Sequence, residues 1–307
     1  MESSRLPRFK RAAGVFPIQL TERDREVIRL VYRNRFLRSS HLIALVGGSS
    51  QQLLRRLQLL YHHGYLERPR AQLDYYHHGG SHHMVYGLGG KGAAVLKQET
   101  GLSFRELPWG EKNRSVGRIF LEHALLVSDV MVAIELSCRQ NGRVRLLSDL
   151  ELLPSALGSK PQTFHWKVNV SKSVALGVIP DRVFGLEFQN QSGVLDRCFF
   201  FLEADRGTMP VKRRGLSQTS FYRKLLAYEA TWEQSIHHSR FGFHRFRVLT
   251  ITSSAERVKS LVSACSDLKR GHGLFLFADR RILEQPTEFF DQVWQTGKQN
   301  ETSRLLD

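Results

Sequence analysis

Three carboxylates stand at the ends of hydrophobic segments in the second half of the chain. Asp181 follows Ile179-Pro180, and Glu203 and Asp205 follow the apolar run Phe199-Phe200-Phe201-Leu202. Carboxylates that lie close together repel one another unless one keeps its proton or a cation lies between them. Ligation by oxygen alone is what Mg²⁺ and Mn²⁺ prefer. These residue types therefore indicate a metal site.

A polar, glycine-ended cluster, Gln189-Asn190-Gln191-Ser192-Gly193, separates the two segments and is typical of the turn of a β-hairpin. If the turn is symmetric about Ser192, Asp181 lies opposite Glu203, with Cβ atoms about 5 Å apart. Asp205 shares the face of Glu203, because side chains alternate with a period of two along a strand. We therefore predict that Asp181, Glu203 and Asp205 form one site for Mg²⁺ or Mn²⁺.

The alternative is that these carboxylates are solvated strand ends, balanced by the neighbouring Arg182 and Arg206. An isolated Glu-x-Asp tripeptide favours that interpretation. Its pairing with Pro-Asp across one hairpin favours the metal site instead.

The composition indicates a globular protein with a polyanionic partner. With 307 residues, of which 41% are hydrophobic, the chain is long enough for one large or two ordinary domains. Its net charge of +16 and pI near 10.2 favour nucleic acid as the partner. No apolar run approaches the ~20 residues that span a bilayer, and the basic N-terminus lacks the apolar core of a secretion signal. We therefore expect a cytoplasmic protein without a membrane partner.

The first hundred residues predict three helices followed by a hairpin. The hydroxyl of Thr21 caps the first helix, and a short second helix covers His41 to Val46. Ser49 or Ser50 caps the third helix. A glycine-rich tip at 79–81 then turns the hairpin.

This order, with the closing segment Tyr86-Gly87-Leu88-Gly89-Gly90-Lys91-Gly92, resembles the winged helix-turn-helix of bacterial proteins, which we place at residues 18–99. The resemblance implies that the third helix enters the major groove of double-stranded DNA. Arg and Gln side chains pair bidentately with guanine and adenine edges. The alternative is a winged helix that docks on another protein. The residues expected to face DNA are Gln51, Gln52, Arg55 and Arg56.

Histidine doublets are a further feature of the chain. Two of them flank the hairpin tip, where four imidazoles could bind zinc. Successive residues of a strand point to opposite faces, so each doublet is split. We therefore favour contacts with phosphate or water over a zinc site. The doublets are His62-His63, His77-His78, His82-His83 and His237-His238.

Residues 100–117 lack periodicity and gather glycine and proline, so we predict a linker there and a second domain at 118–296. Its elements follow the order helix, strand, hairpin, helix, strand, helix, strand, which is typical of a mixed α/β domain. An irregular stretch, Pro154–Ser173, is predicted as an excursion or loop. The other predicted elements are helices at Ile119–Gln140, at Ser217–Ile236 and from Ser253, capped with Glu256, and strands at Val144–Leu147, Phe246–Thr252 and Gly273–Ala278.

A domain of this order, with Pro180-Asp181 on one central strand and Glu203 on the next, resembles the PD-(D/E)XK nuclease fold. With the winged-helix segment and the motifs Phe201–Thr208 and Arg223–Tyr228, the whole chain resembles the replication-relaxation family of plasmids and integrative elements. The resemblance covers about Leu20 to Trp294. It implies a role in plasmid replication and DNA relaxation, similar to plasmid mobilisation relaxases of nuclease-like fold.

The chain departs from the nuclease pattern at Asp205, where a lysine is expected two residues after Glu203. Migrated lysines occur in that superfamily, and the resemblance implies Lys224, near the start of the following helix, as the replacement. An ordinary solvated helix lysine is the alternative. Glu122 is a weaker candidate as a supporting metal ligand, and the basic loop Lys212-Arg213-Arg214 is expected to hold the DNA backbone.

Together these features predict a DNA-binding protein that nicks or relaxes DNA by metal-dependent phosphodiester hydrolysis. One alternative is a non-catalytic replication initiator or regulator, which the missing lysine supports. Another is a covalent relaxase with Tyr222 or Tyr228 as nucleophile, although the His-hydrophobe-His cluster of most tyrosine relaxases is absent from the sequence. A second copy of the chain and other replication or mobilisation proteins are further expected partners. The predicted catalytic residues are Asp181, Glu203, Asp205 and Lys224.

Overall fold

The computed structural model of the chain describes residues 8–12, 17–73, 83–100, 109–152, 164–189 and 192–307. The chain forms two compact units, Met1–Val132 and Ala133–Asp307. The division falls within the long helix α7, Arg118–Asn141, so the first part of this helix belongs to the first unit. Among the residues described, no helix combines the length and apolar character that a membrane span requires.

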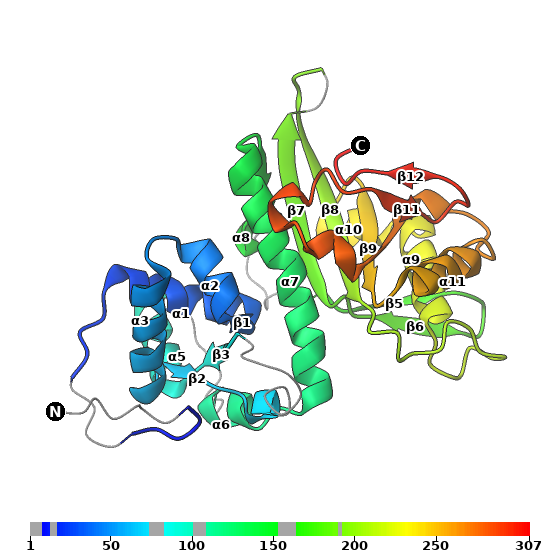
Figure 1. Ribbon diagram of the computed structural model, residues 1–307. Coiled ribbons are helices and arrows are strands. Elements are labelled where there is room, and N and C mark those ends of the chain that lie inside the picture. Colours follow the sequence, from blue (N-terminus) through cyan, green and yellow to red (C-terminus); the bar gives the residue numbers. More distant parts are fainter. Residues whose placement is uncertain (1–7, 13–16, 74–82, 101–108, 153–163, 190–191) are drawn as a thin grey trace. The chain divides into compact units, whose positions relative to one another are not determined.

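The first unit combines helices with a three-stranded antiparallel sheet in the order β1-β3-β2 (Figure 1). The predicted three helices are followed by two paired antiparallel strands, β2 and β3, with an additional strand, β1, between the first two helices. The predicted tip at 79–81 lies outside the described residues. Besides α7, its helices are Glu22–Asn34 (α1), Ser39–Val46 (α2), Ser50–His62 (α3), Gly90–Thr100 (α5), Trp109–Arg114 (α6) and the 3₁₀ turn Arg70–Gln72 (η1). Its strands are Phe36–Arg38 (β1), Leu66–Glu67 (β2) and Val85–Leu88 (β3).

Polar side chains at the helix starts explain where these helices begin. The Thr21 hydroxyl accepts a hydrogen bond from the backbone N–H of Asp24, whose carboxylate accepts one from the Thr21 N–H at 2.8 Å. Ser49 caps α3 by accepting a hydrogen bond from the backbone N–H of Gln52. Both predicted caps are therefore confirmed. The apolar faces of the three helices supply buried side chains, among them Val27, Ile28, Val31, Leu42, Leu53, Leu57 and Leu60.

The segment predicted as a linker, 100–117, contains helix α6. The side-chain amide of Asn113 is buried and donates a hydrogen bond of 2.9 Å to the carbonyl of Leu88 on β3. Residues 101–108 lie outside the described part of the chain. The second half of the predicted linker is therefore ordered structure that packs within the first unit.

The second unit is built on a seven-stranded sheet in the order β12-β11-β10-β9-β8-β7-β4, with a two-stranded sheet, β5-β6, beside it. Strands β8, β9 and β10 run parallel to one another, and the flanking strands pair antiparallel, which confirms the mixed α/β class. The strands are Val144–Leu146 (β4), Trp166–Asn169 (β5), Ala175–Val178 (β6), Arg182–Gln189 (β7), Leu195–Ala204 (β8), Phe246–Thr252 (β9), Phe275–Asp279 (β10), Trp294–Thr296 (β11) and Thr302–Ser303 (β12). The helices are Asp149–Leu152 (α8), Phe221–Glu233 (α9), Ile236–Phe241 (α10) and Ala255–Cys265 (α11), with 3₁₀ turns at His272–Leu274 (η2), Arg280–Leu283 (η3) and Pro286–Glu288 (η4).

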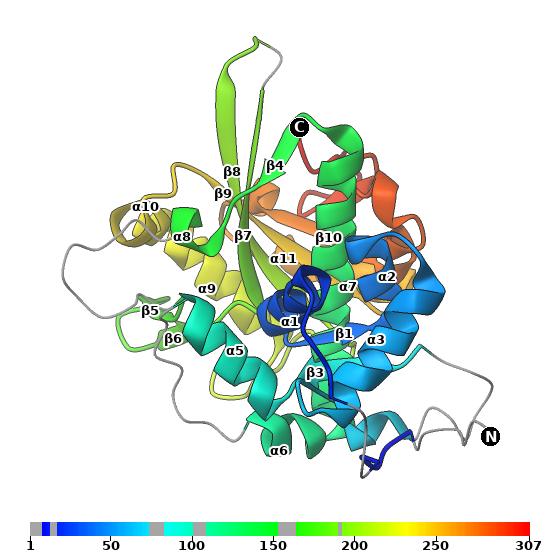
Figure 2. The same ribbon diagram turned by 90° about the vertical axis from the view of Figure 1, so that its left-hand side faces the viewer.

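The pairing of β7 with β8 has the register predicted from the sequence. Arg182 pairs with Leu202, and every pair of this ladder is symmetric about Ser192. Continuing the same register by one residue places Asp181 opposite Glu203. Figure 2 shows the two strands extending beyond the rest of the sheet, and the carboxylates belong to the end away from the turn.

Apolar packing holds α9 and α11 against one face of this sheet (Figure 1), and aromatic rings contribute to it at α9. Phe201 of β8 stacks on Tyr228 of α9 with a centroid distance of 5.6 Å, and Trp166 of β5 lies 5.2 Å from Phe201. Large buried rings contribute much of the stability of such a core. The packing therefore fixes the side chains that α9 presents to the end of β8.

Two predicted elements differ from the structure. The stretch predicted as a loop, 154–173, contains β5, in which burial alternates between residues such as Trp166 and Lys167. The cap of α11 is Ser254 rather than Ser253, since the Ser254 hydroxyl accepts a hydrogen bond from the Arg257 N–H at 3.2 Å. Residues 153–163 lie outside the described part.

Candidate functional site

The end of the β7–β8 hairpin away from its turn brings Asp181 beside Glu203. The backbone N–H of Asp181 donates to the carbonyl of Leu202 at 3.0 Å. Its Oδ2 atom accepts a hydrogen bond of 2.8 Å from the backbone N–H of Ala204. Because these two partners flank Glu203 in the sequence, Asp181 is tied to β8 at that residue.

Glu203 is only 2% exposed, and each of its two carboxylate oxygens has a partner on α9. The Tyr228 hydroxyl donates to Oε1 at 2.5 Å, and the Lys224 ammonium donates to Oε2. Lys224 and Tyr228 lie four residues apart, so they share one face of the helix. The Lys224 side chain is 34% exposed, so the Oε2 side of Glu203 is separated from solvent only by this lysine.

The electrostatics of the site follow from its burial. Burial raises the pKa of Glu203 to about 7, with Lys224 opposing the rise and Asp181 adding to it. Burial lowers the pKa of Lys224, but Glu203 and Asp181 outweigh that effect and raise it above its ordinary value. Burial and the charge of Glu203 raise the pKa of Tyr228. The lysine therefore stays charged and the tyrosine stays a hydrogen-bond donor.

The carboxylate of Asp205 is buried as well, but other donors engage it. Its Oδ2 atom accepts hydrogen bonds of 2.8 Å from Arg257 Nε and from the Thr252 hydroxyl. Its Oδ1 atom accepts one of 3.2 Å from the Gly207 N–H. Arg257 also donates to the carbonyl of Met209 at 2.6 Å. Asp205 thus anchors the loop after β8 to the start of α11.

The donor set allows a test of the predicted metal. In the described part of the chain, no three His, Cys, Asp or Glu side chains are arranged to hold an ion. Mg²⁺, however, is commonly bound by one or two carboxylates and keeps several waters. Asp181 and Glu203 lie at facing strand positions, and Glu203 would fit that chemistry once the partly exposed Lys224 ammonium leaves its Oε2 atom. Asp205 fits it poorly, because a guanidinium and a hydroxyl already occupy its oxygens.

Sequence reasoning missed part of this constellation. Tyr228 carries a local signal, its spacing of four residues from Lys224. Arg257 carries none, because it lies 52 residues from Asp205. Thr250 pairs with Glu203 across β8 and β9, is fully buried, and its hydroxyl has no partner among the residues described.

The other residues considered for chemistry differ in their exposure and in their contacts. Tyr228 is 1% exposed, whereas a covalent nucleophile must reach a DNA phosphate. The hydroxyl of Tyr222 is 3.4 Å from the carbonyl of Asp267. Glu122 pairs with Arg118 at 2.8 Å, in the part of α7 that belongs to the first unit. Tyr228 donates to Glu203 from within the core, whereas Tyr222 contacts Asp267 and Glu122 pairs with Arg118.

Among the residues predicted to face DNA, Gln51, Gln52 and Arg55 are exposed on α3. Arg56 is turned toward α1, where its Nε atom lies 3.0 Å from the carboxylate of Asp24, a residue that is 2% exposed. This partly buried ion pair joins α3 to α1. The exposed face of α3 therefore contains three of the four predicted residues.

The basic loop after β8 has the exposure that its predicted role requires. Arg213 and Arg214 are exposed, and Lys212 forms an ion pair with Asp267. The cation of Lys212 thus has a partner within the second unit.

The histidine doublets split between buried and exposed positions. His62 is buried, and its Nδ1 atom accepts a hydrogen bond of 3.1 Å from the Ala12 N–H. His237 is also buried, with its ring 4.9 Å from that of Phe246. Residues 77, 78 and 82 lie outside the described part.

The protein is a two-unit α/β protein. A helical unit with a small antiparallel sheet precedes a mixed α/β unit, which has a carboxylate–lysine pair at a strand end. Residues 28–245, more than half of the chain, match the family model described as Replication-relaxation. The chain belongs to the replication-relaxation family, which confirms the family predicted from its motifs. No curated protein and no solved structure matches the chain.

Proposed function

We propose that this protein binds double-stranded DNA of a plasmid or mobile element and nicks or relaxes it by metal-dependent phosphodiester hydrolysis. Membership of the replication-relaxation family indicates a role in replication or DNA relaxation. The observation that carries the finer proposal is the convergence of Asp181, Glu203 and Lys224 at one strand end. Two carboxylates and a lysine are the groups that the PD-(D/E)XK pattern requires.

In this proposal Asp181 and Glu203 hold Mg²⁺ or Mn²⁺ at the end of the hairpin. Such an ion, when bound, polarises the phosphate and lowers the pKa of an attacking water. Lys224 stabilises negative charge that develops on the phosphate, because its ammonium already lies beside the carboxylate. Tyr228 keeps one oxygen of Glu203 in place from within the core.

The first unit would select the DNA site as a winged helix-turn-helix, with α3 in the major groove. The exposure of Gln51, Gln52 and Arg55 supports this assignment. Arg213 and Arg214 would contact the DNA backbone near the carboxylates, as their exposure and charge permit. A second copy of the chain and other replication proteins remain proposed partners.

The test is the nicking of supercoiled plasmid in the presence of Mn²⁺. We expect the natural chain to nick, and Asp181→Ala and Lys224→Ala to lower the rate by about 100-fold or more. Asp196→Ala, at the other end of β8, is the matched control and should nick like the natural chain. Equal rates for all four proteins would remove Asp181 and Lys224 from the mechanism.

A second candidate function is a non-catalytic DNA-binding initiator or regulator. Its support is that both oxygens of Glu203 are engaged by α9 and that Arg257 engages Asp205. In this case the natural chain would shift the plasmid in a gel but leave it supercoiled at every Mn²⁺ concentration.

A further inference from the structure

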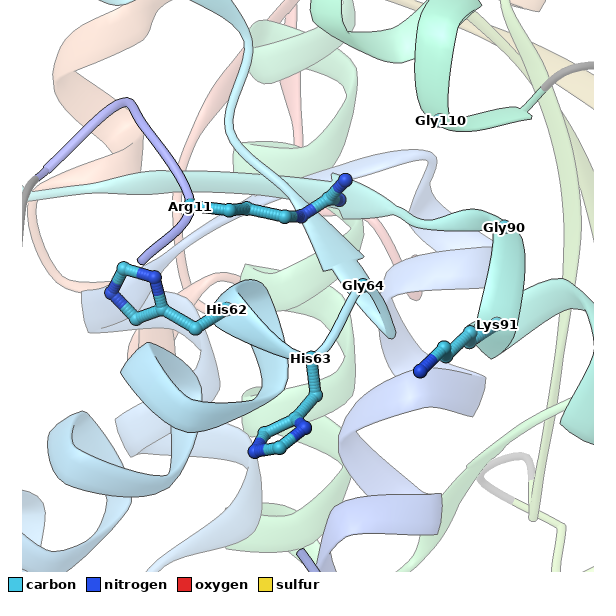
Figure 3. A pocket seen from close by; sticks show the side chains of 7 residues that line it. All are labelled: Arg11, His62, His63, Gly64, Gly90, Lys91 and Gly110. Carbon is cyan, nitrogen blue, oxygen red and sulfur yellow. The ribbon is translucent and has the colours of Figure 1, made fainter. Parts of the chain in front are cut away.

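The first unit contains a pocket of about 420 Å³ whose side chains are basic. Figure 3 shows Arg11, His62, His63 and Lys91 gathered around Gly64, just after the end of α3. Backbone at Gly90 and Gly110 completes the lining. The pocket therefore joins a segment before α1, the end of α3 and the start of α5.

Glycines bring these segments close enough to form the pocket. A Cβ atom on Gly89 would lie 2.3 Å from the carbonyl oxygen of Gly64, and one on Gly92 would lie 2.3 Å from that of Tyr65. Only glycine fits such approaches. The glycine-rich segment around Lys91 is thus pressed against the chain that leaves α3.

The same close approach brings the side chains of Arg11 and Lys91 to either side of Gly64. A Cβ atom built on Gly64 would lie 3.8 Å from Cζ of Arg11 and 3.9 Å from Cδ of Lys91. Gly64 has a φ of +83°, a conformation that glycine adopts without strain. The position between the two side chains is therefore left open.

The charges around the pocket are unequally balanced. Glu67 lies next to it and is buried, but its carboxylate is shared by Arg11 at 2.8 Å and Arg114 at 3.1 Å. Lys91 is exposed, and its ammonium is 6.0 Å from the ring of Tyr65. Among the described residues that line the pocket, none has a carboxylate side chain. Positive charge therefore exceeds negative charge there.

Burial and nearby positive charge also act on His62. Burial lowers its pKa, and Arg68, His63 and Arg11 lower it further. The His62 ring therefore stays neutral and adds no positive charge to the pocket. The cluster would be stabilised by an anion at its open side.

We propose that this pocket binds a phosphate group, supplied by the backbone of bound nucleic acid. Arg and Lys are the side chains that most often contact phosphate oxygens. The inference rests on the proposed DNA binding and adds a contact at the other end of α3. The 13 residues of α3 span roughly 18 Å, more than the ~12 Å width of the major groove. If Gln51 and Gln52 enter the groove, the C-terminal end of α3 extends beyond it and lies near the phosphate backbone.

The test compares Lys91→Ala with Lys97→Ala in the full chain. Both lysines are exposed on α5, so each change removes one positive charge from the same helix. Binding to a fluorescent duplex is measured by anisotropy over a series of salt concentrations. Lys91→Ala should weaken binding and reduce the slope of log K against log salt by about 1, whereas Lys97→Ala should leave the slope unchanged.

Inorganic phosphate provides the second measurement, because it tests the pocket without DNA. In amide NMR spectra, phosphate should shift resonances around Gly64 and Gly90 in the natural chain and in Lys97→Ala, but not in Lys91→Ala. Shifts together with unequal slopes support a pocket for backbone phosphate. If phosphate shifts these resonances but the two lysine variants give equal salt slopes, the pocket binds free phosphate and not the nucleic-acid backbone, which overturns the proposal.

The two proposals fail in different ways. If the natural chain binds no duplex, the proposed DNA-binding function fails. If it binds duplex while both lysine variants give equal slopes, and phosphate shifts no resonance near the pocket, the inference is overturned and the proposed function stands.

Discussion

Glu203 is the residue on which the polar contacts of the second unit converge. One oxygen faces Tyr228, which is inside the core, and the other faces Lys224, which is partly exposed. The two partners therefore have different roles. The tyrosine fixes the carboxylate, whereas the lysine occupies the side from which an ion or a phosphate would approach.

This division of roles predicts the effect of removing the tyrosine hydroxyl. Tyr228→Phe leaves a buried oxygen of Glu203 without its donor, and the cost of an unsatisfied buried group is about 1–3 kcal/mol. We expect the free energy of unfolding, measured in urea, to fall by that amount. Tyr222→Phe is the control, since its hydroxyl makes only a 3.4 Å contact with a backbone carbonyl, and it should change stability by less than about 0.5 kcal/mol. Equal losses in both variants would contradict this account of Glu203.

At the scale of the elements, the loop after β8 is held by α11. Arg257 lies in the first turn of that helix and reaches both Asp205 and the carbonyl of Met209. The loop leads on to Arg213 and Arg214. The ion pair therefore positions a basic loop next to the strand end that contains Glu203.

Breaking this ion pair from one side should be costly. Arg257→Met leaves the buried Asp205 carboxylate without its cation, and single removals of this kind destabilise by roughly 3–5 kcal/mol. Adding Asp205→Asn removes the unpaired charge and should restore a large part of the loss. Thermal unfolding of the single and double variants measures both effects. Additive losses in the double variant would show that the two residues do not act as a pair.

How far the sequence predicts these elements depends on the range of the contacts. The β7–β8 register could be predicted because a polar turn and a period of two are local features, and Lys224 could be expected near Glu203 because α9 follows the hairpin. The contacts of the Asp205 side chain could not be predicted, since its partner Arg257 is distant in the sequence. The strand β5 has only four residues, and its alternation was too short to outweigh the surrounding polar residues.

At the scale of the whole molecule, the residues that match the family model come from both units. Residues 28–245 include the helical part of the first unit and the β7–β8 hairpin with α9 of the second. The family match therefore covers parts of both units, including the strand end that contains Glu203. A net charge of +16 adds a general attraction for polyanions to both.

These features predict that the two units contribute differently to DNA binding. The double change Arg213→Ala/Arg214→Ala removes the two proposed backbone contacts, so affinity should fall by a similar factor for all duplexes, and the salt slope should decrease by about 2. Lys259→Ala/Arg280→Ala removes two exposed cations elsewhere in the second unit and should leave the slope unchanged.

The double change Gln51→Ala/Gln52→Ala removes neutral groups from the exposed face of α3. It should therefore alter the preference among duplex sequences while the salt slope stays the same, because neutral side chains displace no counterions. Anisotropy titrations with a panel of duplexes at several salt concentrations separate the two effects. A slope that falls with the glutamine changes, or a sequence preference that moves with the arginine changes, would contradict the assignment of sequence preference to Gln51 and Gln52 and of backbone contacts to Arg213 and Arg214.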